Sequence, residues 1–174
     1  MKTSEADILI IPGWSSSGPD HWQTRWEKNL KTARRVEQED WIRPDKDQWV
    51  ARIVEAAAQS VRPVVIVAHS LGAVAVAHAG AKLARLPAPP VGAFLVAPAD
   101  VDNAGGWPVT AGETFGASQE TGFAPMPKSI LPFPSVLVAS SNDPYCSLER
   151  ARAMATTWGS TVIESGDVGH INVG

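Results

Sequence analysis

The sequence predicts an α/β protein with a mostly parallel sheet of about six strands and helices on both of its faces. Two observations predict this class. Short apolar runs rich in β-branched residues alternate along the chain with helical patterns, and strands separated by helices pair in parallel. The apolar runs also contain few polar positions, as expected for strands that are buried on both faces.

Six segments fit these strands. The first, residues 8–11, is an apolar run that ends at Pro12-Gly13, a pair that favours a turn. The others, in chain order, are residues 35–38, 64–68, 92–97, 136–139 and 161–164.

Four helical patterns lie between the strands. The first follows Asp20, which we expect to cap it with Gln23 as capping-box partner, and it places Trp22 and Trp26 on one stripe. The second opens at Asp45 and keeps an apolar stripe through residues 50–61. The third and fourth cover residues 71–85 and 148–158.

The segment 99–134 differs from the rest of the chain. Nine of the 14 prolines lie between positions 87 and 134, and proline removes backbone hydrogen bonds from helices and ladders. We therefore expect a long loop without long elements, placed after a strand at the edge of the sheet where ligands of such proteins bind.

Length and composition exclude several classes. The 174 residues suit one domain over 1–174, with 44% apolar and 19% charged residues. The net charge is −3 and Lys and Arg form no block, so we expect no nucleic-acid partner. One cysteine, Cys146, forms no internal disulfide or cysteine zinc site, and four scattered histidines predict no metal.

The cellular location is predicted from the chain's apolar stretches. The first residues lack a basic segment followed by a long apolar one, so we expect a cytoplasmic protein. Residues 63–81 carry no formal charge and approach the length of a membrane span. Because their first half is β-branched and their second half is rich in alanine, a buried strand followed by a buried helix explains them better.

The strand at 64–68 leads into the strongest chemical signal. The string Ala68-His69-Ser70-Leu71-Gly72 places a serine between two tiny residues where a strand turns into a helix. This pattern is typical of the nucleophile elbow of the α/β-hydrolase fold, in which a strained turn exposes the serine at a helix N-terminus. The usual first small residue is glycine, and alanine adds only a methyl group. The alternative is that Ser70 only caps the helix.

A serine nucleophile needs a histidine base and an orienting carboxylate, in the chain order Ser, Asp, His for this fold. Asp143 follows the strand 136–139. His170 follows the last strand in the string Gly166-Asp167-Val168-Gly169-His170, whose glycines let the backbone bring the imidazole close to other loops. Asp100 and Asp102 follow the fourth strand and are alternatives for the acid.

The surroundings of the serine supply further candidates. The oxyanion hole of this fold uses the N–H of the residue after the nucleophile, Leu71, and one from the loop after the first strand. In that loop we choose Trp14, with Ser15 as the second choice, and expect Gly13 to permit unusual backbone angles. The same loop lacks the Lys-Ser/Thr of a phosphate-binding loop.

Three more residues complete the candidate site. We expect Ser15 and Trp107 on loops that meet the substrate, and His21 either to line the pocket or to pack. His69 should point away from the point of attack and have a structural role. Cys146 has no elbow around it and is no rival nucleophile.

Four motifs together resemble the small retinoblastoma-binding-protein-nine-like serine hydrolases. They are Ile10-Ile11-Pro12-Gly13-Trp14 with Ser17-Gly18-Pro19-Asp20-His21-Trp22, the elbow at 68–72, Ser141-Asn142-Asp143-Pro144-Tyr145, and Gly169-His170-Ile171-Asn172. The resemblance spans nearly the whole chain. It implies Ser70, Asp143 and His170 as the triad and a single-domain cytoplasmic hydrolase without a large cap, with esterase- or aminopeptidase-like activity.

Two departures limit what the resemblance implies. The retinoblastoma-protein motif Leu-x-Cys-x-Glu is absent around Cys146, so we expect no such partner. The chain also ends four residues after His170, where such folds normally add a helix, so we expect either a truncated sequence or an unusually short C-terminus.

The residues predict a serine hydrolase that cleaves small ester or amide substrates through an acyl-enzyme, with no cofactor. Thioesterase and lactonase reactions would use the same residues. The alternative from another class is an inactive binding protein on the same scaffold.

Overall fold

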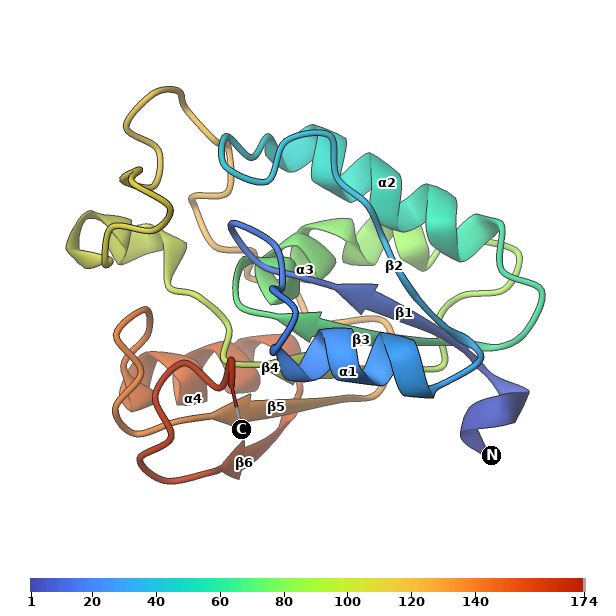
Figure 1. Cartoon of the computed structure of the whole chain (residues 1–174). Coiled ribbons are helices and arrows are strands. Elements are labelled where there is room, and N and C mark those ends of the chain that lie inside the picture. The colour runs from blue at the N-terminus through green and yellow to red at the C-terminus, as the bar shows by residue number, and fades with distance from the viewer. Residues whose placement is uncertain (174) are drawn as a thin grey trace.

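A six-stranded sheet, entirely parallel, forms the centre of the computed structural model, which describes residues 1–173 (Figure 1). The strand order is β2-β1-β3-β4-β5-β6. The strands are β1 (Asp7–Ile11), β2 (Ala33–Arg35), β3 (Val64–His69), β4 (Gly92–Val96), β5 (Ser135–Ala139) and β6 (Thr161–Glu164). The predicted fold class is confirmed, since the sheet is parallel and its strands alternate with helices.

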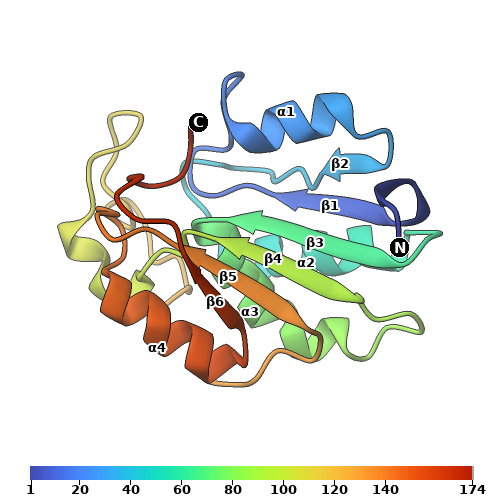
Figure 2. The same cartoon turned by 90° about the horizontal axis from the view of Figure 1, so that it is seen from below.

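Helices cover the two faces of the sheet unequally. The α-helices are α1 (Trp22–Asn29), α2 (Lys46–Ala58), α3 (Leu71–Leu83) and α4 (Leu148–Trp158), with short 3₁₀ helices at η1 (Thr3–Glu5) and η2 (Val101–Gly106). Residues of α2, α3 and α4 share one large core with Leu9, Ile66 and Leu137 of the sheet. The opposite face, with Ile8 and Val67, packs against residues at the two ends of α1 (Figure 2).

Part of that second face stays open. Figure 2 views the sheet from this side, with α1 displaced towards β1 and β2. A cleft of about 500 Å³ lies beside the helix, lined mainly by apolar side chains that include Trp26, Val65 and Phe94. Farther along the sheet, Ile163 of β6 is 49% exposed.

Five of the six predicted strands lie within two residues of their observed bounds. The second was wrong: the strand is Ala33–Arg35, whereas 35–38 was expected. The apolar signal misled because β2 is an edge strand whose three residues are only half-buried, whereas the buried Val36 and Gln38 follow it.

The predicted cap of α1 was also wrong. His21, one residue after Asp20, is the N-cap, and its Nδ1 accepts a hydrogen bond from the Gln23 backbone N–H. The Gln23 side chain is fully buried, and its amide donates to the carbonyls of Ile11 and Val67 at 3.1 Å each. Gln23 therefore ties α1 to the sheet and takes no part in a capping box.

The proline-rich segment 99–134 forms a loop, as predicted. It contains η2 and one isolated bridge between Thr110 and Glu113, and no longer regular element. In Figure 1 it is the yellow to orange path beside the carboxyl ends of the strands. Within residues 1–173, none of the helices is long and apolar enough to cross a membrane.

Candidate active site

The predicted nucleophile, base and acid come from three loops at one edge of the sheet. Ser70 directly follows β3, Asp143 follows β5, and His170 follows β6. Because all six strands are parallel, these loops leave the sheet at the same edge. The edge therefore brings together residues that are up to 100 positions apart in the sequence.

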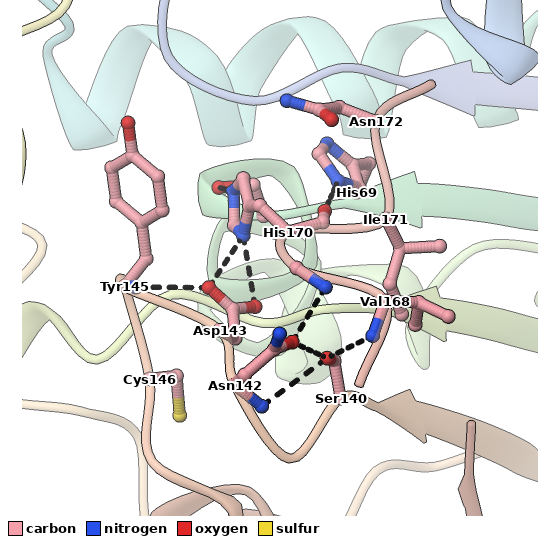
Figure 3. A network of polar contacts seen from close by, with 12 residues as sticks. His69, Ser140, Asn142, Asp143, Tyr145, Cys146, Val168, His170, Ile171 and Asn172 are labelled. Atoms are coloured by element: carbon pink, nitrogen blue, oxygen red, sulfur yellow. Dashed lines mark hydrogen bonds and ion pairs between the residues drawn. The ribbon is translucent and has the colours of Figure 1, made fainter. Parts of the chain in front are cut away.

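The three side chains form a continuous chain of hydrogen bonds. His170 Nε2 lies 2.8 Å from Ser70 Oγ. His170 Nδ1 lies 2.9 Å from both carboxylate oxygens of Asp143 (Figure 3). A carboxylate can only accept, so the proton of the neutral imidazole is on Nδ1. Nε2 is then free to accept the proton of the Ser70 hydroxyl.

Ser70 has an unusual backbone. Its φ is 55° and its ψ is −124°, a conformation that costs free energy for a residue with a side chain. The two small neighbours are explained by packing. Ala68 is fully buried, and a Cβ on Gly72 would lie 2.4 Å from the carbonyl oxygens of Ile11 and Pro12. The elbow therefore fits directly against the end of β1.

Gly13 is needed in this loop, but the expected reason, unusual backbone angles, was wrong. The positive φ angles in this loop belong to Ser15 (67°) and Ser16 (63°). Gly13 is instead required for close approach, since a Cβ there would lie 2.7 Å from Ser70 Cβ. The loop after β1 and the elbow are thus in contact through two glycines.

Two backbone N–H groups beside the serine are candidate oxyanion donors. Leu71 is the first residue of α3, where backbone N–H groups have no acceptor within the helix. The Trp14 N–H has no acceptor among residues 1–173. The alternative donor was wrong: the Ser15 N–H already donates to the Trp41 carbonyl at 2.9 Å.

The loop that carries His170 is held against the loop that carries Asp143. Asn142 Oδ1 accepts from the Gly169 N–H at 2.6 Å. Ser140 Oγ accepts from the Val168 N–H (Figure 3) and donates to the Gly166 carbonyl. Sequence reasoning missed Ser140 and Asn142 as contributors. The available signals were their positions within three residues of Asp143 and, for Asn142, its place in the motif Ser141-Asn142-Asp143-Pro144-Tyr145.

Two aromatic rings hold His170 from its sides. The Tyr145 ring centroid lies 4.2 Å from that of His170, and the His69 centroid lies 4.8 Å from it. Burial lowers the pKa of His69 well below its ordinary value, so this ring is neutral. Its Nε2 lies 2.8 Å from the carbonyl oxygen of His170 and donates to it. His69 therefore positions the histidine loop, in line with the structural role expected for it.

A cavity of about 320 Å³ opens above the serine. Its walls include all three predicted substrate-binding residues, Ser15, His21 and Trp107, together with Ser70 and His170. Thr110, Tyr145 and Asn172 also line it and were not among the predicted substrate-binding residues. His21 both lines the cavity and packs, since its ring centroid is 4.7 Å from that of His69.

The alternative acids Asp100 and Asp102 are bound to an arginine, and Cys146 is not a nucleophile. Arg150 donates to both carboxylate oxygens of Asp100 and to one of Asp102. Burial, reinforced by the charges of Asp100 and Asp143, raises the pKa of Cys146 to about 12, so its thiol stays protonated. Within residues 1–173, no group of three or more His, Cys, Asp or Glu side chains could hold a metal ion.

The fold and the serine elbow together define an α/β hydrolase. The profile of the serine hydrolase family matches residues 8–174, and the chain belongs to this family. A sequence comparison with curated proteins finds no match.

Solved structures support the fold. The structure of a YdeN-like hydrolase from Pectobacterium atrosepticum is 29% identical, with a TM-score of 0.78 over 98% of this chain and 82% of that one. The ydeN gene product from B. subtilis is 16% identical, with a TM-score of 0.68 over 97% of this chain and 88% of that one. YbtT, a type II thioesterase of yersiniabactin biosynthesis, is 16% identical, with a TM-score of 0.66 over 96% and 86%.

Proposed function

We propose that the protein hydrolyses small esters or amides by acyl transfer to Ser70. The observation that carries this proposal is the 2.8 Å contact between Ser70 Oγ and His170 Nε2, on a strained elbow at the mouth of a cavity. A hydroxyl becomes an effective nucleophile when a base accepts its proton during attack.

The proposed reaction has two halves. Ser70 Oγ attacks the substrate carbonyl carbon while its proton passes to His170 Nε2. The resulting oxyanion accepts hydrogen bonds from the backbone N–H groups of Leu71 and Trp14. The tetrahedral species collapses, and His170 gives its proton to the leaving alcohol or amine. Water then attacks the acyl-enzyme by the same route, which releases the acid and restores the Ser70 hydroxyl.

Asp143 has a supporting role in this scheme. Its two oxygens accept from His170 Nδ1, which fixes the tautomer and stabilises the imidazolium that forms in each half. The backbone N–H of Tyr145 donates to Asp143 Oδ1 at 2.9 Å and so fixes the carboxylate in turn.

We further propose that the chain is a relative of the retinoblastoma-binding-protein-nine-like hydrolases within the serine hydrolase family. The four ordered motifs support this, and the missing Leu-x-Cys-x-Glu string argues against a retinoblastoma-protein partner. The scheme needs no metal or organic cofactor. The same steps would hydrolyse esters, thioesters and amides.

Labelling with a fluorophosphonate probe tests the proposal, with mass spectrometry to locate the adduct. We expect one adduct per chain on Ser70, lost in Ser70→Ala and in His170→Ala. Ser160→Ala is the matched control, because its hydroxyl pairs with Ser135 and lies outside the cavity. An unlabelled wild-type protein with a native circular dichroism spectrum would refute the proposal and favour an inactive binding protein.

A further inference from the structure

Two side chains that line the cavity each carry a buried N–H group with no acceptor among residues 1–173. These groups are Nε2 of His21 and Nε1 of Trp107. The residues are only 7% and 9% exposed, and both line the cavity above Ser70. Unpaired buried donors are rare because they cost free energy, so an acceptor supplied by a ligand would explain them.

The proton on His21 Nε2 follows from its neighbours. The backbone N–H of Gln23 donates to Nδ1, so Nδ1 must carry a lone pair. Burial, with smaller effects from Arg35 and His170, lowers the pKa of His21 to about 4, so the ring is neutral near pH 7. The single ring proton is therefore on Nε2, which makes this atom a donor.

The rings that carry the two donors are linked to His170 through different neighbours. On one side, the ring centroid of His69 is 4.8 Å from that of His170 and 4.7 Å from that of His21. On the other side, the Tyr145 centroid is 4.2 Å from that of His170 and 5.5 Å from that of Trp107. Because His69 and Tyr145 lie on different sides of His170 (Figure 3), a carbonyl under attack at Ser70 would have the ring of His21 towards one side and that of Trp107 towards the other.

We propose that the substrate carries oxygen acceptors on both the acyl side and the leaving-group side of the scissile carbonyl, and that these bind His21 Nε2–H and Trp107 Nε1–H. This inference rests on the proposed function and specifies its substrate class.

The charges of the residues that line the cavity further restrict the class of substrate. No lysine or arginine is among its described lining residues, whereas Asp20 is one of them. Two neutral donors beside an acidic residue suit ether, carbonyl or amide oxygens and disfavour carboxylates and phosphates. The substrates are thus small neutral polar esters or amides rather than aliphatic ones.

Three esters of equal chain length test the inference. Butyl butanoate has methylenes on both sides, butyl methoxyacetate replaces one acyl methylene by oxygen, and 2-methoxyethyl butanoate does the same on the alcohol side. Each kcat/KM is divided by the ester's rate of alkaline hydrolysis, which removes intrinsic reactivity. We expect each oxygen to raise the corrected value about tenfold, as for one buried hydrogen bond.

Two variants assign the preferences to residues. His21→Asn keeps a capping oxygen for α1 and removes Nε2–H, and Trp107→Phe keeps an aromatic ring and removes Nε1–H. We expect each variant to lose about tenfold of one preference and to retain the other. His78→Asn and Trp158→Phe are matched controls, because their N–H groups have protein acceptors, the carbonyls of Phe123 and Pro127.

The outcomes separate this inference from the proposed function. Preferences that disappear in His21→Asn and Trp107→Phe, and persist in both controls, support it. Equal corrected rates for the three esters, with Ser70 still labelled by the fluorophosphonate, would overturn the inference and leave the triad intact. Absence of labelling in the folded protein would overturn both.

Discussion

Replacing Asp143 by Asn should disable the base without removing any atom from the site. The Tyr145 backbone N–H donates to Asp143 Oδ1, and in the variant it will retain the amide oxygen at that position. The amide nitrogen then faces His170 Nδ1 and donates to it. Because Nδ1 must now accept, the ring proton moves to Nε2, which can no longer take the proton of Ser70.

The expected loss follows from this wrong tautomer. A triad histidine held in the wrong tautomer loses about 10⁴-fold in kcat, which is roughly 5.4 kcal/mol at about 1.36 kcal/mol per tenfold. The assay is hydrolysis of the preferred ester from the series above, with the fluorophosphonate labelling rate as a second readout. Both should fall, since both depend on Ser70 being activated.

Asp100→Asn is the control. Asp100 is buried and is an alternative acid by sequence, but it accepts from Arg150 and Asn103 instead of a histidine. Its variant should lower the free energy of unfolding and leave kcat within about threefold. A thousandfold loss in Asp100→Asn, with Asp143→Asn within tenfold of wild type, would refute the assignment of the acid.

Three further changes test the elbow and the buried histidines. Ser70→Gly should abolish labelling and yet raise Tm by about 2–4 °C, because glycine adopts a positive φ without the cost of about 1 kcal/mol that serine bears. Gly72→Ala should lower the free energy of unfolding by about 1–3 kcal/mol in urea, since its Cβ would overlap two carbonyl oxygens, whereas Gly105→Ala faces open space. The pKa values of His21 and His69 are lowered in the fold, so the unfolded state binds more protons below pH about 6.5. Stability should therefore be complete above that pH and fall as the pH drops towards 4, by at most about 1.4 kcal/mol per pH unit for each histidine.

Each of these outcomes has a clear opposite. A lower Tm in Ser70→Gly would show that the serine side chain stabilises the turn. Equal unfolding midpoints for Gly72→Ala and Gly105→Ala would mean that the elbow and the end of β1 can move apart freely. A urea midpoint that does not change between pH 7 and 4.5 would mean that the two histidines are protonated in the folded protein.

The sequence predicts best those helices and strands whose buried positions form a regular pattern of apolar residues. Strands β1 and β3 are apolar runs between clear turn residues, and α4 was predicted with its observed bounds, Leu148–Trp158. The half-buried edge strand β2 has no such apolar pattern, and its position was predicted wrongly. The polar cap of α1 was assigned to Asp20 because aspartate is the more usual capping residue.

In the site, too, residues with a local sequence pattern could be predicted, and residues that act through distant contacts could not. Ser70 was recognisable because a strained turn restricts its neighbours to small residues. Gly13 was assigned the wrong reason, because a contact with Ser70 from a distant strand leaves no trace in the local sequence. Ser140 and Asn142 act through hydrogen bonds to residues about 26 positions away, and only the folded chain brings these together.

The positive φ of Ser70 also bears on the history of the chain. A protein that had lost its activity could replace this serine by glycine with one or two nucleotide changes, and would gain stability by doing so. An inactive protein would therefore have no reason to keep serine at this position. A serine in this strained conformation is what the proposed acyl transfer to Ser70 requires.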